Sequence, residues 1–423
     1  MTGFSPSLVV SDGYGNVFDV PELIPAGASG RFIGNIPSSE WIPLPDGSKI
    51  FELPGRLPIG IDRESGEIKI LDSEEDENIM AVAAFVAPAY TITHLAAWET
   101  EKDAPILPLF AYAAVGWCEG RFYVPAIRVD ADIRQDPSQF NFFRIKKNAK
   151  KILKQYPNNR LARHLIENCA LRYHCPAAQN YVLNRWEMPL PTSKKCNARC
   201  IGCISFQPNT SIPCTQERMD FIPTPEEIVE IAVPHLETAP LPIVSFGQGC
   251  EGEPLLNGEL LIKSVAEIRR RTNKGTINLN TNASKPEVVR ELRKAGLDSM
   301  RVSMNSVREK YYMKYFRPVD YDFKDVLESI RVMKEMGGFV SINFFVFPGF
   351  VDQPEEVKML INFISEYRID MIQWRNLNID PEYYLDGIGV EDVSGIGIRM
   401  MMKEVKEKCP WLRYGYFNPY LGK

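Results

Sequence analysis

Three cysteines fall within eight residues, in the stretch TSKKCNARCIGCIS. Cys196, Cys200 and Cys203 follow a C-x3-C-x2-C spacing, and thiolates this close repel one another unless a bound cation lies between them. A closed tetrahedral zinc site has four Cys or His ligands, and His174 and Cys214 reach the triplet only if folding brings them there. The triplet favours an iron–sulfur cluster with one open iron. Zinc ligation and three unrelated buried cysteines are the alternatives.

A second stretch, VSFGQGCEGEPLL at 244–256, has residues that suit a ligand. Its glycines and its proline permit a tight turn that brings backbone carbonyls and a carboxylate together, which suits an ammonium group. Alone, such a turn with two acids is more often a structural loop. Its place after an expected strand, one strand along from the cysteine triplet, favours binding, because the carboxyl ends of parallel strands meet at one rim.

The other cysteines form a weaker pattern. We expect four of them to ligate a second 4Fe-4S cluster that relays electrons or binds substrate: Cys118, Cys169, Cys175 and Cys214. His174 is a substitute ligand for this set. The alternative is that these cysteines are buried as small hydrophobic side chains, as we expect of Cys250 and Cys409.

The elements that position these residues change along the chain. Residues 1–135 contain short β-branched and aromatic runs broken by Gly and Pro, which predict a small, mostly antiparallel β domain. Residues 136–184 show helical periodicity and are expected to form a connector. Residues 185–380 alternate six apolar runs with five amphipathic segments, and 381–423 form a C-terminal extension. The fold class is therefore α/β, with a parallel sheet that is doubly wound or curled into a partial barrel.

Composition limits the partners and the location. The chain has 423 residues, 45% of them hydrophobic, and a formal net charge of −5, so no global field attracts nucleic acid or an anionic membrane. The basic stretch at 144–164 is expected to be a solvated helix face, with RNA binding as the weaker alternative. Neither a secretory signal nor a run of apolar residues that would span a bilayer is evident, so we expect a cytoplasmic protein whose cysteines are not paired in disulfides.

The cysteine spacing after the first strand of a β/α series resembles the radical SAM superfamily, over residues 185 to about 380. This resemblance implies a partial (β/α)6 barrel, with a 4Fe-4S cluster on the three cysteines and S-adenosylmethionine on the open iron. It also implies reductive cleavage of S-adenosylmethionine to a 5′-deoxyadenosyl radical, which abstracts hydrogen from an unidentified substrate. A peptide or a small metabolite is favoured, and a reductant such as flavodoxin or ferredoxin is implied.

The resemblance extends to further residues, with one departure. The 244–256 turn resembles the Gly-Gly-Glu-Pro motif of the superfamily, with Glu251 in place of the first Gly. The implied cofactor-binding residues, which include polar groups at the expected strand ends, are Gly252, Glu253, Pro254, Asn280, Asn282, Ser303, Asn305 and Arg317. The family has an aromatic residue before the third cysteine, where this sequence has Gly202. The alternative function is a non-catalytic iron–sulfur or zinc protein with a β binding module.

Overall fold

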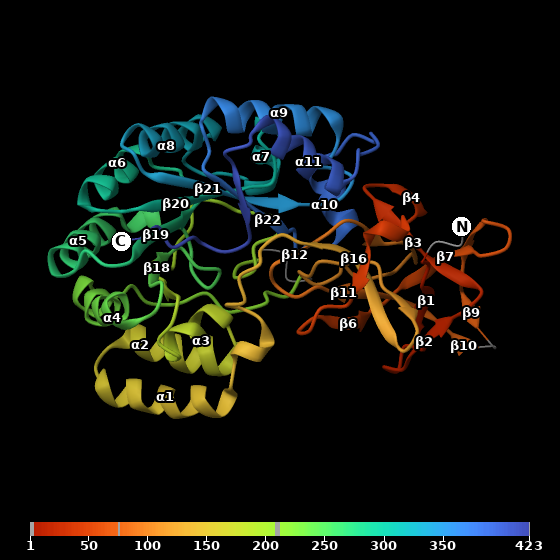
Figure 1. Ribbon diagram of the computed structural model, residues 1–423, viewed down its shortest axis with the longest axis horizontal. Coiled ribbons are helices and arrows are strands. Elements are labelled where there is room, and N and C mark those ends of the chain that lie inside the picture. The colour runs from red at the N-terminus through yellow and green to blue at the C-terminus, as the bar shows by residue number, and fades with distance from the viewer. Residues whose placement is uncertain (1–3, 75–76, 208–211, 423) are drawn as a thin grey trace.

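The N-terminal third of the protein is built from antiparallel β-sheets. The computed structural model describes residues 4–74, 77–207 and 212–422. The strands of this region are β1 (Ser7–Ser11), β2 (Val17–Val20), β3 (Leu23–Ser29), β4 (Phe32–Asn35), β5 (Trp41–Pro43), β6 (Lys49–Glu52), β7 (Arg56–Asp62), β8 (Ile68–Ile70), β9 (Ser73–Glu74), β10 (Glu77–Asn78), β11 (Met80–Phe85), β12 (Tyr90–Ile92), β13 (Leu95–Ala96), β14 (Trp98–Thr100), β15 (Gly116–Cys118) and β16 (Arg121–Arg128). They form sheets of eight, six and two strands, orange and red in Figure 1.

A helical segment follows and leads into the barrel. Its elements are α1 (Phe142–Gln155), α2 (Arg160–His164), a π-helix (Leu165–Arg172) and α3 (Pro176–Val182). Asn141 and Asn159 are the N-cap residues of α1 and α2. Each side chain accepts a hydrogen bond from the backbone N–H of the residue three positions later in the chain. The π-helix continues α2 without a break, and its hydrogen bond from Tyr173 N to Asn168 O, 2.9 Å, spans five residues. These helices lie below the barrel in Figure 1.

A parallel sheet with helices on its outer face forms the rest of the protein. Its strands, in spatial and chain order, are β17 (Glu187–Leu190), β18 (Ile243–Phe246), β19 (Thr276–Thr281), β20 (Ser299–Met304), β21 (Phe339–Val346), β22 (Met371–Asn376) and β23 (Arg413–Gly415). The helices are α4 (Pro225–Thr238), α5 (Gly258–Arg271), α6 (Pro286–Ala295), α7 (Glu309–Phe316), α8 (Phe323–Glu335), α9 (Pro354–Glu366), α10 (Pro381–Ile388) and α11 (Ile398–Lys408). The predicted α/β partial barrel is confirmed, and β23 adds a seventh strand from the C-terminal segment.

The two faces of the parallel sheet differ in polarity. Alternate residues such as Val244, Ile277, Val302 and Ile342 are fully buried, as a face covered by helices requires. The opposite face is polar, with the cross-strand neighbours Asn280, Arg301 and Ser341 and, one step along, Ser303, Asn343 and Gln373. Closed barrels of this type usually fill their interior with branched apolar side chains. A polar interior therefore indicates space for a ligand rather than a packed core.

The β domain is fixed to the barrel by buried polar contacts. Arg56 pairs with Asp380 at 3.2 Å, and both side chains are 3% exposed. Asn376, the last residue of β22, accepts a hydrogen bond from Ile92 N at 2.9 Å. A buried ion pair that loses one partner leaves an uncompensated charge, so these contacts resist separation of the two parts.

The C-terminal residues close the barrel from the end where its strands begin. Asn418 is 2% exposed, donates to Glu187 Oε1 at 2.7 Å and accepts from Gln373 Nε2 at 3.1 Å. Leu421 N donates to Thr276, the first residue of β19. These contacts put the C-terminal segment on the floor of the barrel. None of the helices in the described residues is long and apolar enough to cross a membrane.

Candidate functional site

One cavity of about 530 Å³ collects most of the predicted site residues. Those that line it are Cys196, Cys200, Cys203, Gly252, Glu253, Pro254, Asn280, Asn282 and Ser303. Asn305 and Arg317 are not among the described residues that line it. Asn305 is fully buried and donates to Tyr311 O, while Arg317 is exposed and its Nε lies 3.4 Å from Lys314 O at the end of α7.

The three cysteines of the triplet are half-buried on the cavity wall. Burial, together with the neighbouring thiols, raises the pKa of Cys200 well above its usual value, and burial next to Glu253 raises that of Cys196 to about 11. Arg218 Nη2 donates to Cys203 Sγ at 3.5 Å, which puts one positive charge beside the three thiols. Three half-buried thiols in one wall fit a bound metal cluster, because the metal supplies further positive charge that thiolates need.

The spread of these thiols distinguishes a cluster from a single ion. Within the described part of the chain, the triplet does not form a group whose ligand atoms all lie within 4.8 Å of one another. Ligands of one zinc ion converge more tightly, whereas cysteines of a 4Fe-4S cluster each bind a different iron. The geometry therefore fits the cluster better than the zinc alternative.

The turn after β18 is joined to the cysteine loop by backbone hydrogen bonds. Gly252 N donates to Ser193 O at 2.6 Å, and Glu253 N donates to Lys195 O at 2.8 Å. A Cβ atom on Gly252 would lie 1.9 Å from Lys195 O, so no other residue fits there without moving backbone. The turn and the residues before Cys196 thus form one rigid unit.

Two buried carboxylates complete this unit. Glu251 accepts hydrogen bonds from the backbone N–H groups of Thr192, Ser193, Gly247 and Gln248 at 2.6–2.9 Å. Glu253 accepts from Leu255 N, Thr281 Oγ1 and Asn282 N. Burial raises the pKa of both carboxyl groups to about 7, against the effect of these hydrogen bonds. Glu251 holds the loops after β17 and β18 together, and Glu253 holds the loops after β18 and β19.

The structure shows what occupies the space next to Gly202, where the superfamily has an aromatic side chain. A Cβ atom on Gly202 would lie 2.8 Å from the hydroxyl of Tyr315, which belongs to α7 and lines the cavity. The end of α7 is fixed to the cysteine loop, because Ile201 N donates to Tyr315 O at 3.1 Å. An aromatic ring is therefore present beside the third cysteine, supplied by a distant part of the chain.

Two arginines in the cavity were not predicted. Arg301 on β20 and Arg375 on β22 both line it. Burial, and secondarily the charge of Arg375, lowers the pKa of Arg301 to about 10. Arg301 Nη1 donates to Gln373 at 3.1 Å, while its Nε is buried without a partner in the described residues. The sequence contains a pattern that could have predicted these arginines. In the strands SMRVSM and MIQWRN successive side chains point to opposite faces, and this alternation places both arginines on the polar face of the sheet.

The four cysteines predicted for a second cluster lie in different surroundings. Cys118 is on β15, Cys214 is exposed, and Cys175 begins α3 and lines the cavity. Cys169 is buried in the π-helix, where it is grouped with Cys250 and His164.

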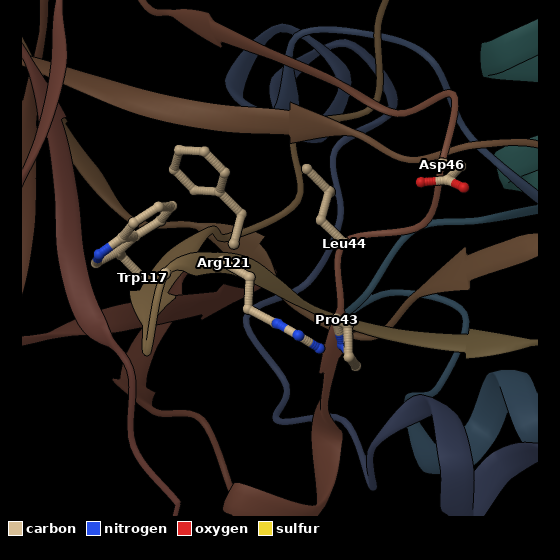
Figure 2. Close-up of a pocket in the computed structure, with 7 residues that line it drawn as sticks. Pro43, Leu44, Asp46, Trp117 and Arg121 are labelled. Carbon is tan, nitrogen blue, oxygen red and sulfur yellow. The ribbon is translucent and has the colours of Figure 1, made fainter.

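Another hollow, of about 550 Å³, lies in the β domain and lacks these groups. It is lined by Pro43, Leu44, Asp46, Trp117, Gly120, Arg121 and Phe122. Figure 2 shows the Arg121 side chain extending toward Pro43. With no cysteine or histidine among the described residues that line it, this hollow offers iron neither a thiolate nor an imidazole ligand.

The fold and the cavity define a class of α/β protein in which a partial barrel carries a three-cysteine loop after its first strand and a polar interior beside it. Residues 190–364 match the model of the radical SAM superfamily. This part of the chain is a radical SAM domain, the domain of enzymes that bind S-adenosylmethionine and a 4Fe-4S cluster.

Similar proteins cover parts of the chain. A GTP 3′,8-cyclase of Clostridium botulinum is 28% identical over 233 residues, which are 52% of this chain and 67% of the cyclase. An uncharacterized protein of Methanocaldococcus jannaschii is 30% identical over 133 residues, and the match spans 29% of that protein's length and 30% of this chain. Among solved structures, a radical SAM methyltransferase from Sphaerobacter thermophilus has a TM-score of 0.37 and 15% identity, over 54% of this chain and 64% of that chain.

Proposed function

We propose that this protein is a radical SAM enzyme in which Cys196, Cys200 and Cys203 hold a 4Fe-4S cluster and the turn at Gly252–Pro254 receives the methionine part of S-adenosylmethionine. The observation that supports this most directly is the joining of the cysteine loop and the turn into one rigid unit on the wall of a single cavity. When bound and reduced, the cluster supplies the electron that cleaves S-adenosylmethionine to methionine and a 5′-deoxyadenosyl radical.

The chain's own residues hold the two ligands in a fixed relation. Because Glu251 and Glu253 accept hydrogen bonds from backbone N–H groups, they position the turn. A carbonyl oxygen has two lone pairs, so the carbonyls of the turn have further capacity to accept from an ammonium group. Tyr315 presents an aromatic ring at the third cysteine, next to the space in which an adenine can stack. The asparagines Asn280 and Asn282 extend the polar wall at the end of β19.

The deeper part of the cavity favours an anionic substrate. Arg301 and Arg375 place two guanidinium groups in one partly desolvated wall, and guanidinium binds carboxylate or phosphate with paired hydrogen bonds. Arg301 Nε is buried without a partner in the described residues, so an anion that fills this part of the cavity gains a hydrogen bond that the empty site leaves unmade. The substrate class we propose is a small molecule or peptide that carries a carboxylate or a phosphate.

The test is the conversion of S-adenosylmethionine to 5′-deoxyadenosine by anaerobically reconstituted, dithionite-reduced protein. We expect product from the wild type and none from Cys200→Ala, with Cys409→Ala as a buried-cysteine control that remains active. A protein that loads a cluster without cleaving S-adenosylmethionine is the non-catalytic alternative. Because the cyclase relative is named for GTP, whose phosphates suit two arginines, GTP is the first substrate to add. Faster 5′-deoxyadenosine formation with GTP supports this substrate, and no change excludes it.

A further inference from the structure

A second group of metal-ligating side chains lies outside the cavity that the proposed function uses. His164, Cys169 and Cys250 each offer one ligand atom, and these three atoms all lie within 4.8 Å of one another. Cys169 is 5% exposed and Cys250 is 8% exposed, so both side chains are buried. We call this group the connector site, because two of its residues belong to the helical segment between the β domain and the barrel.

The local backbone brings the first two residues of the connector site together. His164 ends α2, and Cys169 follows five residues later in the π-helix. In an α-helix a five-residue spacing puts two side chains on different faces, whereas π-helical hydrogen bonds join residues five apart. The wider turn therefore puts the imidazole and the thiol on the same side. π-helical segments are rare in proteins, and those that do occur are often found at functional sites. The π-helix is therefore a second observation that points to ligand binding.

One ring nitrogen of His164 is unpaired among the described residues. His164 Nδ1 lies 3.2 Å from Asn168 Nδ2, while Nε2 is buried and has no hydrogen-bond partner among the described residues. A half-turn of the Asn168 amide would set its oxygen against Nδ1, so that the amide accepts from Nδ1–H and a lone pair is left on Nε2. Metal-bound histidines usually donate their other N–H in this way.

We propose that His164, Cys169 and Cys250 bind a single zinc ion, with the fourth position open to water. Two thiolates and an imidazole are a ligand set that zinc accepts, and ligands about 2.0–2.3 Å from a tetrahedral ion lie about 3.3–3.8 Å apart. The three atoms thus need to move by about 1 Å or less to reach it. The spacing suits one ion rather than a cluster, in which each thiolate binds a separate iron.

The ion would brace the turn that the proposed function assigns to S-adenosylmethionine. Cys250 directly precedes Glu251, which ties that turn to the cysteine loop. The residues after the cysteine loop cover the connector site from the other side, since Met219 N donates to Cys250 O at 2.9 Å and the Phe221 ring meets the His164 ring edge-on. One ion would therefore link two segments, the connector and the turn, and the chain that follows the triplet packs against both.

The experiment separates the connector site from the cluster. The full chain with Cys196, Cys200 and Cys203 all changed to Ala is purified anaerobically from zinc-supplemented medium, and zinc, iron and sulfide are measured per chain. We expect about one zinc and no iron. Adding His164→Gln or Cys250→Ser should lower zinc at least tenfold, whereas adding Cys409→Ala, a buried cysteine elsewhere, should keep it. His164 is only half-buried, and circular dichroism checks that the Gln variant is folded.

A second measurement uses cobalt as the probe. Replacing zinc by Co²⁺ in the same triple variant should give thiolate-to-cobalt absorption that Cys169→Ser and Cys250→Ser each weaken and Cys409→Ala does not. Full zinc retention in the folded His164→Gln/Cys250→Ser protein would overturn the proposal. So would iron with sulfide in place of zinc, or a metal-free protein in which Cys169 and Cys250 are joined as a disulfide. Because the triplet is absent from the test protein, failure of the zinc proposal leaves the proposed function untouched.

Discussion

The two walls of the cavity are built in opposite ways. One wall, which we call the cysteine wall, consists of residues 192–203 and 247–254. Its buried carboxylates and backbone groups form hydrogen bonds with one another, and none of its described side chains has a buried polar atom without a partner. The arginine wall, on β20–β22, leaves Arg301 Nε and Asn343 Oδ1 buried and unpaired among the described residues. One wall is complete without a ligand, whereas the other has bonding capacity that a ligand can use.

This difference separates positioning from recognition. A wall that is internally bonded holds a cofactor in the same place in every turnover, because little reorganisation accompanies binding. A wall with unpaired donors is less stable when empty and gains more when a complementary group arrives. The predictions below test whether the two walls respond differently to substitution.

The largest effect on activity is expected from Gly252→Ala on the cysteine wall. The new methyl group would meet Lys195 O at 1.9 Å and force the turn away from the cysteine loop. We expect loss of 5′-deoxyadenosine formation and a fall in the free energy of unfolding of about 3 kcal/mol, as for other overpacked buried sites. Gly34→Ala is the matched control, because a Cβ atom there has nothing within 4 Å. Normal activity in Gly252→Ala would show that the two loops are not a rigid unit.

Glu251→Ala removes the carboxylate that joins the loops after β17 and β18. Four backbone N–H groups, two of them buried and two partly buried, lose their acceptor, so we expect a loss of about 3–5 kcal/mol in urea unfolding of the cluster-free protein. Glu237→Ala on exposed helix surface serves as the control and should change stability by less than about 0.5 kcal/mol. Equal stabilities for the two variants would contradict the internal bonding of the cysteine wall.

Arg301→Met tests the arginine wall, where we expect a change in ligand binding with little loss of stability. Removing a buried guanidinium with an unpaired Nε is expected to leave the stability of the empty protein within about 1 kcal/mol of the wild type, or above it. Inorganic phosphate should raise the thermal midpoint of the wild type and no longer do so in this variant. The control is Arg317→Met, outside the cavity, which should keep the phosphate response. S-adenosylmethionine affinity that falls in Arg301→Met would reassign Arg301 to the cosubstrate carboxylate.

The last effect leaves activity unchanged and is a pH dependence of stability at His235 on α4. Burial lowers the pKa of His235 to about 4, and its Nδ1 has no partner in the described residues while Nε2 faces Trp186 O at 2.8 Å. Below pH 6.5 the unfolded chain binds a proton that the folded protein excludes. Stability should therefore fall as pH decreases from 6.5 to 4, by at most about 1.4 kcal/mol per pH unit.

Urea unfolding at several pH values, with His235→Gln, measures this contribution. The amide can still donate to Trp186 O, so we expect a flatter profile and preserved folding. His174→Gln, at an exposed position, should leave the slope unchanged. A slope that is the same in both variants would assign the pH dependence to other groups.

Sequence patterns predicted the parts of the site that depend on local spacing. The triplet and the turn at Gly252–Pro254 reach the same cavity because they follow neighbouring strands of a parallel sheet. Local sequence patterns could not predict contacts between segments that are far apart in the chain. Tyr315 beside Gly202 depends on how α7 packs, and Cys250 beside His164 depends on a π-helical turn that no composition rule indicates.

The position of Asn418 also sets an order of events during synthesis. Its partner Glu187, the first residue of the barrel's first strand, is made 231 residues earlier in the chain. At about 5–20 residues per second, that interval lasts on the order of ten seconds or more. Until residue 418 leaves the ribosome, the polar floor of the barrel stays open to water. Cluster insertion into a nascent chain therefore meets an incomplete cavity until Asn418 has emerged and paired with Glu187.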